Sequence, residues 1–223
     1  MPHSITKPVG FTAILIAATL FLGLTASAGP AEDAAALVEK IRTENGIPGM
    51  SAAVAIDGKI VWSQGFGSAN LEQNVPATPQ TVYRVGSISK MLTTGAVAKL
   101  VEQGKLDLDA PIQKYVPTFP EKPEGAITTR MLTAHLSGIS HYKPLDPPDW
   151  RRKHYDDVVD ALQEFQDRPL QHAPGSEYQY SSYAWNLVSA VVQGAAGVPF
   201  LEYMDAAVFK PLDMENTQAD DPR

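Results

Sequence analysis

The stretch that decides the fold is Val85-Gly86-Ser87-Ile88-Ser89-Lys90, which opens a long apolar segment. The pattern predicts a helix over Ile88–Gln103, with Gly104 as its stop signal. Apolar residues are spread around most of the circumference of this helix, which is typical of a buried helix. Because Ser87 and Lys90 are three residues apart, we expect them to be neighbours on one surface of the first turn.

The Ser87 and Lys90 pair forms a Ser-x-x-Lys pattern that can carry nucleophilic catalysis. A lysine in a low-dielectric site loses its proton more readily than an exposed one, and the neutral amine can then take the proton of a serine hydroxyl. Ser87 also lies at a helix N-terminus, where free backbone N–H groups favour developing negative charge. The alternative is that Ser87 only caps the helix and Lys90 extends into solvent.

The order of the other elements predicts an α+β chain. Two strands, Met50–Ile56 and Lys59–Gln64, are predicted around Asp57-Gly58, since this pair suits a tight hairpin turn with positive φ at both positions. The segment His141–Tyr155 holds three prolines and a basic cluster, which indicates a surface loop. Helical or amphipathic segments are predicted over Ala31–Asn45, Thr128–Ala134, Asp156–Gln166, Ser182–Gln193 and Pro199–Lys210.

The composition excludes several function classes. With 44% hydrophobic residues, the 223-residue chain can form one sizeable core, so it is neither disordered throughout nor a coiled coil. The net charge of −7 argues against nucleic-acid binding, and the absence of cysteine excludes thiolate zinc sites and thiol nucleophiles. The histidines form no HExxH-like pattern, so we expect no metal and no organic cofactor, and His135 is predicted to be structural, in a turn.

The N-terminus indicates export. Val9–Leu24 is uncharged and shorter than the roughly 20 residues of a membrane span, and Ala26-Ser27-Ala28 has the small-residue spacing that signal peptidase accepts. We therefore predict a signal peptide over residues 1–28, cleaved rather than kept as an anchor, and a periplasmic or secreted protein. Contact with the membrane is expected only through this segment if it stays uncleaved. Residues 29–223 are predicted to form one hydrolase domain.

Further short motifs lie around the predicted hairpin and helix. Ile47-Pro48-Gly49 precedes the hairpin, Gly65-Phe66-Gly67 follows it, and His135-Leu136-Ser137-Gly138 comes after the helix. Pro174-Gly175 then introduces Tyr178-Gln179-Tyr180-Ser181-Ser182. With the Ser-x-x-Lys pattern, these motifs resemble the serine β-lactamase and penicillin-binding-protein superfamily in its class C-like branch. Within that branch, Lys105–Tyr142 is most similar to the mitochondrial serine β-lactamase-like proteases.

The resemblance implies a fold and a set of site residues. The implied fold is β-lactamase/transpeptidase-like, an antiparallel sheet flanked by helices with a helical subdomain. Ser87 matches the nucleophile, Lys90 the group that removes its proton, and Tyr180 the phenol that passes the proton to the leaving group. Ser182 lies at the substrate-binding position where class C enzymes carry Asn. Because a hydroxyl cannot reproduce the donor and acceptor of an amide, this difference favours a peptidase or esterase over a β-lactamase.

The resulting prediction is an exported serine hydrolase that cleaves an amide or ester through a Ser87 acyl-enzyme. Its substrate would be a small peptide, an ester or a β-lactam-like compound. The resemblance also implies a late Lys/His-Thr/Ser-Gly motif, and no such triplet follows Ser182. We therefore expect a C-terminally truncated domain with an incomplete sheet, inactive by itself. The alternative is a non-catalytic fragment or pseudoenzyme that binds peptides or a partner.

Overall fold

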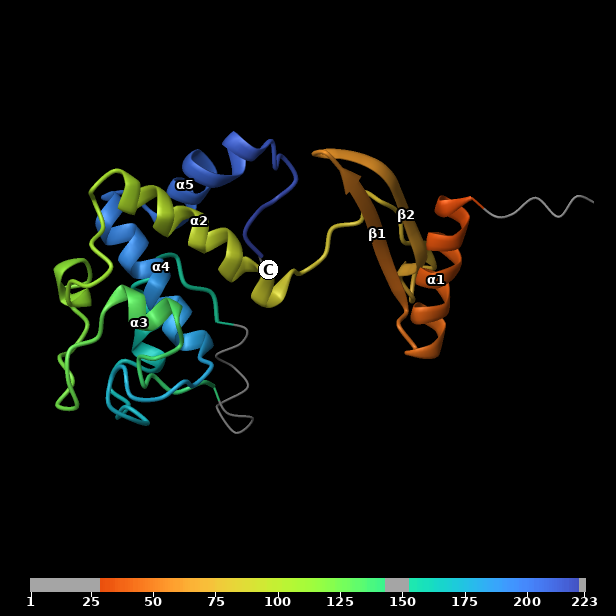
Figure 1. The fold of residues 1–223 in the computed structure, drawn as a ribbon. Helices are drawn as coiled ribbons and strands as arrows, with labels where there is room; N and C mark the ends of the chain where they lie inside the picture. The colour runs from red at the N-terminus through yellow and green to blue at the C-terminus, as the bar shows by residue number, and fades with distance from the viewer. Residues whose placement is uncertain (1–28, 143–152, 221–223) are drawn as a thin grey trace, which may run out of the picture. The chain divides into compact units, whose positions relative to one another are not determined.

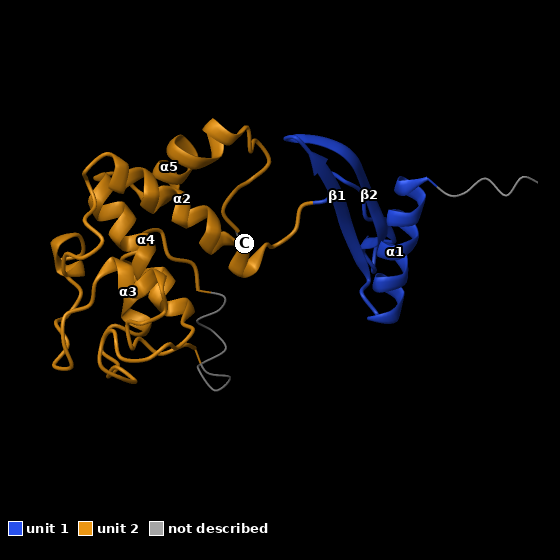
Figure 2. Cartoon of the chain, in the orientation of Figure 1, with its two compact units in different colours: residues 1–81 blue, residues 82–223 orange. Residues whose placement is uncertain are grey.

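The computed structural model describes residues 29–142 and 153–220 (Figure 1). The predicted signal peptide at 1–28 and most of the predicted loop after His141 lie outside the described residues. The chain divides into two compact units, residues 1–81 and residues 82–223 (Figure 2). Each unit has its own set of elements: the strands belong to the first, and the second is helical in the part that the structure describes.

The first unit confirms the predicted helix and hairpin. The hairpin turn has φ 49° at Asp57 and 73° at Gly58, as expected for this pair. The sheet is antiparallel in the order β1-β2-β3. The second strand is longer than predicted, and the short third strand was missed because two residues carry no detectable period. The elements are α1 (Pro30–Glu44), β1 (Gly49–Ile56), β2 (Lys59–Asn70) and β3 (Val75–Pro76).

Gly65 in β2 is required because the chain after β3 passes close to its backbone. A Cβ added at Gly65 would lie 2.1 Å from the carbonyl oxygen of Ala77, so only glycine lets the chain after β3 pass β2 at this point. The tip of the hairpin is apolar and exposed, with Ile56 at 58% and Ile60 at 70% exposure. Among the described residues, β1 pairs with β2 only. The hairpin therefore presents apolar side chains that the first unit itself does not cover.

The core of the second unit is built around helix α4 (Ser182–Ala196), which contacts α2 (Ser89–Glu102), α3 (Thr129–Thr133) and α5 (Phe200–Met204) (Figure 1). The side chains that α4 buries completely or almost completely are apolar or aromatic: Tyr183, Ala184, Leu187, Val188, Ala190, Val191 and Val192. In the described ranges, no single helix is long and apolar enough to cross a membrane, and α4 with Phe200–Leu212 meets that test only as a pair bent by 79°.

Helix α2 corrects one prediction. Its buried residues, Thr93, Ala96, Val97 and Leu100, lie on the side that packs against the rest of the second unit. Ile88, just before the helix, is 59% exposed and Met91 is 71% exposed. The prediction of a helix buried on all sides is therefore wrong for this unit. Apolar residues on every face allow a helix to be buried, but each face is buried only where another element packs against it.

Two further helix predictions were too long. Over Asp156–Gln166 the structure has only the 3₁₀ helix η3 (Asp160–Glu164), because the Asp157 carboxylate accepts the Val159 N–H at 2.7 Å and forms a local turn instead. The predicted Pro199–Lys210 helix is divided into α5, a π-helical turn η4 (Asp205–Phe209) and a 3₁₀ turn η5 (Lys210–Leu212). Both segments still bury apolar side chains, among them Leu162 and Val208.

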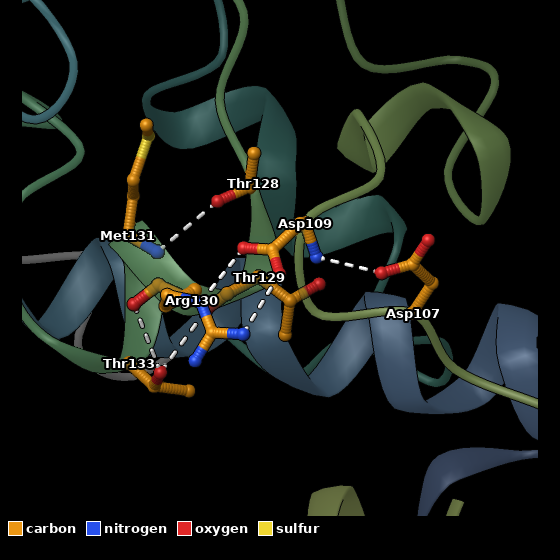
Figure 3. Close-up of polar contacts among 7 residues, drawn as sticks. All are labelled: Asp107, Asp109, Thr128, Thr129, Arg130, Met131 and Thr133. Carbon is orange, nitrogen blue, oxygen red and sulfur yellow. Dashed lines mark hydrogen bonds and ion pairs between the residues drawn. The ribbon is translucent and has the colours of Figure 1, made fainter. Parts of the chain in front are cut away.

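Polar contacts fix the start of α3 (Figure 3). Thr128 is the N-cap, and its hydroxyl accepts the Met131 N–H at 3.3 Å. The Arg130 guanidinium donates to both carboxylate oxygens of Asp109, at 2.7 and 2.8 Å, and holds the pKa of that carboxyl below its usual value. Such an exposed pair adds little stability, but it joins α3 to the loop after α2. The chain that leaves α3 leads directly into the turn at His135.

Candidate active site

Ser87 lies in a 3₁₀ turn, η1 (Gly86–Ile88), that leads directly into α2. Gly86 has φ 52°, a conformation that favours glycine, although a Cβ there would meet no atom within 4 Å. Neither η1 nor α2 is capped by a side chain. The alternative that Ser87 serves as an N-cap is therefore wrong, and its hydroxyl is free for other contacts.

The Ser87 hydroxyl contacts both other residues predicted to act on its proton. Lys90 Nζ donates to Ser87 Oγ at 3.0 Å, and Ser87 Oγ lies 2.7 Å from the Tyr180 hydroxyl. Lys90 Nζ is also 5.0 Å from the centre of the Tyr180 ring. Lys90 is half-buried. The alternative that its side chain only extends into solvent is therefore wrong. The structure thus brings together one residue pair from the start of α2 and one tyrosine from the segment before α4.

The surroundings of Tyr180 favour its ionised form. Hydrogen bonding from Lys90 lowers the pKa of the Tyr180 phenol below its usual value, with smaller contributions from Ser87 and Ser182. Partial desolvation acts in the opposite direction and is the weaker effect. The side chain remains 36% exposed. Tyr180 can therefore exchange a proton with Ser87 more easily than an ordinary tyrosine and is accessible from solvent.

Ser182 is the first residue of α4 and lies beside Tyr180. Its hydroxyl is among the hydrogen-bonding groups that lower the Tyr180 pKa. The neighbouring Ser181 is the N-cap of α4: its buried hydroxyl accepts the Ala184 N–H and donates to the Ser140 carbonyl, both at 3.0 Å. This cap fixes the backbone direction at the point where the tyrosine segment becomes helix. All four predicted site residues therefore lie in one cluster in the second unit.

Two histidines of this cluster were missed as site residues. The turn predicted for His135 is confirmed by its φ of 61°, but its ring also lies 4.6 Å from the Tyr180 ring. His141 approaches the same ring edge-on at 5.4 Å. Burial lowers the pKa of His135, and the nearby charges of Lys90 and His141 lower it further. The sequence offered the His-Leu-Ser-Gly motif as a signal, but nothing local to it points to a tyrosine distant in the chain.

The cluster is suited to acyl transfer through a nucleophile. A serine hydroxyl within hydrogen-bond distance of an amine and of a phenol with a lowered pKa has two routes by which its proton can leave. In the described ranges, no group of three or more His, Cys, Asp or Glu residues is arranged to hold a metal ion. The chemistry that these side chains support is attack by Ser87 on a carbonyl carbon.

Comparison with known proteins identifies the class. The chain matches the family model "Beta-lactamase" over residues 34–223. It is 35% identical over 247 residues to the human mitochondrial serine beta-lactamase-like protein LACTB, covering 81% of this chain and 45% of that protein. Among solved structures it is similar to EstCE1, described as a hydrolase with promiscuous acyltransferase activity, at 28% identity and a TM-score of 0.69 over 80% of this chain and 50% of that one.

A class C β-lactamase from Rhodobacter sphaeroides is a further structural neighbour, at 28% identity and a TM-score of 0.63, covering 79% of this chain and 48% of that one. The α+β, β-lactamase/transpeptidase-like fold implied by the sequence motifs is therefore confirmed. The chain belongs to the β-lactamase family, a family of hydrolases. It spans about half the length of these relatives. The boundaries predicted for the signal peptide and the hydrolase domain stay predictions.

Proposed function

We propose that the gene product is an exported serine hydrolase that cleaves an ester or amide through an acyl-enzyme on Ser87. The observation that carries this proposal is the contact of one hydroxyl with an amine and a phenol: Ser87 Oγ lies 3.0 Å from Lys90 Nζ and 2.7 Å from the Tyr180 hydroxyl. A protein that only bound peptides or a partner would have no need of this arrangement. Export to the periplasm or outside the cell rests on the uncharged Val9–Leu24 segment and the Ala26-Ser27-Ala28 site.

In the proposed acylation step, Ser87 Oγ attacks the carbonyl carbon while its proton passes to Lys90. Tyr180 then gives a proton to the departing alcohol or amine and is reprotonated by Lys90, which holds the proton taken from Ser87 and hydrogen-bonds to the Tyr180 phenol. The Ser87 backbone N–H, at the entry to α2, is the first proposed donor to the oxyanion. Water attacks the acyl-enzyme in the second step and releases the acid, with Lys90 and Tyr180 exchanging the same proton in reverse.

Ser182 directs the proposed substrate class toward small activated esters and short peptides. A serine hydroxyl reaches less far than the Asn amide of class C enzymes and offers one donor in place of two. The amide group of a β-lactam side chain would therefore lose a partner in this site. EstCE1, the structural neighbour described as a hydrolase with promiscuous acyltransferase activity, supports hydrolysis and acyl transfer on this fold.

The substrate preference can be measured as a ratio of kcat/KM for a nitrophenyl ester and a chromogenic cephalosporin, using the full-length gene product. We expect the ester to be preferred. Ser182→Asn should shift the ratio toward the cephalosporin by about tenfold, the value of one additional good hydrogen bond. Ser189→Asn, two turns further along α4, should leave the ratio unchanged. A wild-type preference for the cephalosporin of more than about tenfold would contradict this proposal.

A further inference from the structure

Two segments distant in the sequence run side by side next to the candidate site. The turn that begins at His135 and the segment that leads to Tyr180 are joined by backbone hydrogen bonds. Gln171 N donates to the Gly138 carbonyl at 2.7 Å, and Gln179 N donates to the His135 carbonyl at 2.8 Å. A Cβ at Gly138 would lie 2.3 Å from the His172 carbonyl oxygen, so the two backbones touch. The His135 turn is thus a fixed support for the tyrosine segment.

His135 and His141 both accept hydrogen bonds from the backbone directly after Tyr180. Ser181 N–H donates to His135 Nδ1 at 3.1 Å, and Ser182 N–H donates to His141 Nδ1, also at 3.1 Å. A ring nitrogen accepts a hydrogen bond only when it carries no proton, so both rings must be neutral with the hydrogen on Nε2. Two consecutive amides are therefore held by two imidazoles, each in one defined tautomer.

The His135 and His141 rings also contact the ring of Tyr180. The His135 ring is tilted by 36° against the Tyr180 ring at 4.6 Å, and the His141 ring meets it at 77° and 5.4 Å. The backbone contacts and the ring contacts together restrict both the position and the rotation of the phenol. Its hydroxyl lies 2.7 Å from Ser87 Oγ and must stay within hydrogen-bond distance for proton exchange, and a shift of about 1 Å can cost roughly a hundredfold in rate.

We propose that His135 and His141 are positioning residues that aim Tyr180 at Ser87, and that protonation of their accepting nitrogens in acid releases the Tyr180–Ser182 segment. This inference rests on the proposed function, because it assigns Tyr180 a role in proton exchange with Ser87. A protonated imidazole carries hydrogen on both nitrogens, so it would face the Ser181 or Ser182 N–H with a donor instead of an acceptor. The site would therefore lose its geometry at low pH.

The groups around each ring determine the pH at which release occurs. His135 faces Lys90, His141, Tyr178 and Tyr180, and it packs against Trp185.

His141 faces Tyr142 and Tyr180 in addition to His135. Burial lowers the His135 pKa, and the charge of Lys90 and that of His141, once this ring is protonated, lower it further. The His135 contact is therefore complete above the ordinary histidine value of about 6.5 and is lost as the pH falls through the lower folded value.

A pair of His141 variants separates positioning from packing. Asparagine carries its side-chain oxygen where histidine carries Nδ1, so His141→Asn keeps an acceptor that cannot be protonated near neutral pH, whereas His141→Leu removes it. The readout is the rate at which a fluorophosphonate labels Ser87 in the full-length gene product. We expect His141→Leu to slow labelling at least tenfold at pH 7.5 and His141→Asn to stay within about threefold of wild type. Equal rates for the two variants would overturn the proposal.

A second experiment measures how the rate of Ser87 labelling depends on pH. Wild-type labelling should decline below about pH 6.5, and the double variant His135→Asn/His141→Asn should move this decline to lower pH. Asparagine tolerates the positive φ at residue 135, so the backbone turn is preserved. His154→Asn, at a histidine paired with Asp156, is the control and should leave the profile unchanged. An unmoved acid decline in the double variant would contradict the proposal.

Nitrogen NMR of histidine-labelled protein tests the geometry without relying on activity. Both rings should show the Nε2–H tautomer at pH 7.5, with signals assigned by their loss in the two asparagine variants. An Nδ1–H tautomer at either position would overturn the proposal. If wild-type Ser87 is not labelled but both tautomers are as expected, the proposed hydrolase function fails while the support of the Tyr180 segment stands.

Discussion

Replacing Ser87 with alanine is expected to abolish ester hydrolysis by the full-length gene product, with kcat/KM falling by roughly 10³-fold or more. Ser87 Oγ is the atom that Lys90 and Tyr180 both contact, so its removal leaves no nucleophile at the centre of the cluster. The rate of nitrophenyl ester hydrolysis measures this loss. Ser189→Ala, in α4 and away from the cluster, should keep the wild-type rate.

Stability should be unaffected by the same substitution. Ser87 is exposed and caps no helix, so Ser87→Ala removes neither core packing nor a capping hydrogen bond. We expect its thermal unfolding midpoint to match that of the wild type within experimental error. A Ser87→Ala protein that is folded and hydrolyses the ester at the wild-type rate would show that another residue is the nucleophile.

Replacing Lys90 with alanine is expected to cost nearly as much activity as the loss of the nucleophile. Lys90 contacts Ser87 Oγ directly, and its hydrogen bonding is the main reason that the Tyr180 pKa lies below its usual value. Without Lys90, the Tyr180 pKa should return toward the ordinary tyrosine value of about 10, so any residual activity should require more alkaline pH. The pH profile of ester hydrolysis measures both effects.

The double variant Ser87→Ala/Lys90→Ala shows whether the two residues act as a unit. We expect it to be no slower than Ser87→Ala alone, because losses within one catalytic unit do not add. Lys99→Ala, on the same helix in an exposed pair with Glu102, is the matched control and should stay within about twofold of wild type. Fully additive losses would contradict a shared role.

Features that depend on residues close together in the chain could be predicted from the sequence. The spacing of Ser87 and Lys90 placed them on one helical turn, and the structure brings their functional atoms to 3.0 Å. The Asp57-Gly58 pair indicated the hairpin because its backbone requirement is carried by two adjacent residues. The position of Tyr180 beside Ser87 came only from the resemblance to a family, since no local pattern links residues so far apart.

The parts that depend on distant contacts were missed. The burial of each face of α2 depends on which elements pack against it. The exposure of Met91 could therefore not be predicted from the apolar residues of the helix. The π-helical turn after α5 interrupts a segment whose composition is helical throughout. The roles of His135 and His141 depend on hydrogen bonds to Ser181 and Ser182 across the fold. Each of these features is set by tertiary packing, which single-sequence patterns do not encode.

Covalent labelling shows whether Ser87 is the nucleophile. The full-length gene product is treated with a serine-directed fluorophosphonate, and intact mass and peptide mapping locate the adduct. We predict one adduct per chain, on Ser87, absent in Ser87→Ala and strongly slowed in Lys90→Ala. An adduct on a different serine, or no adduct on a folded protein that hydrolyses the nitrophenyl ester, would contradict the assignment.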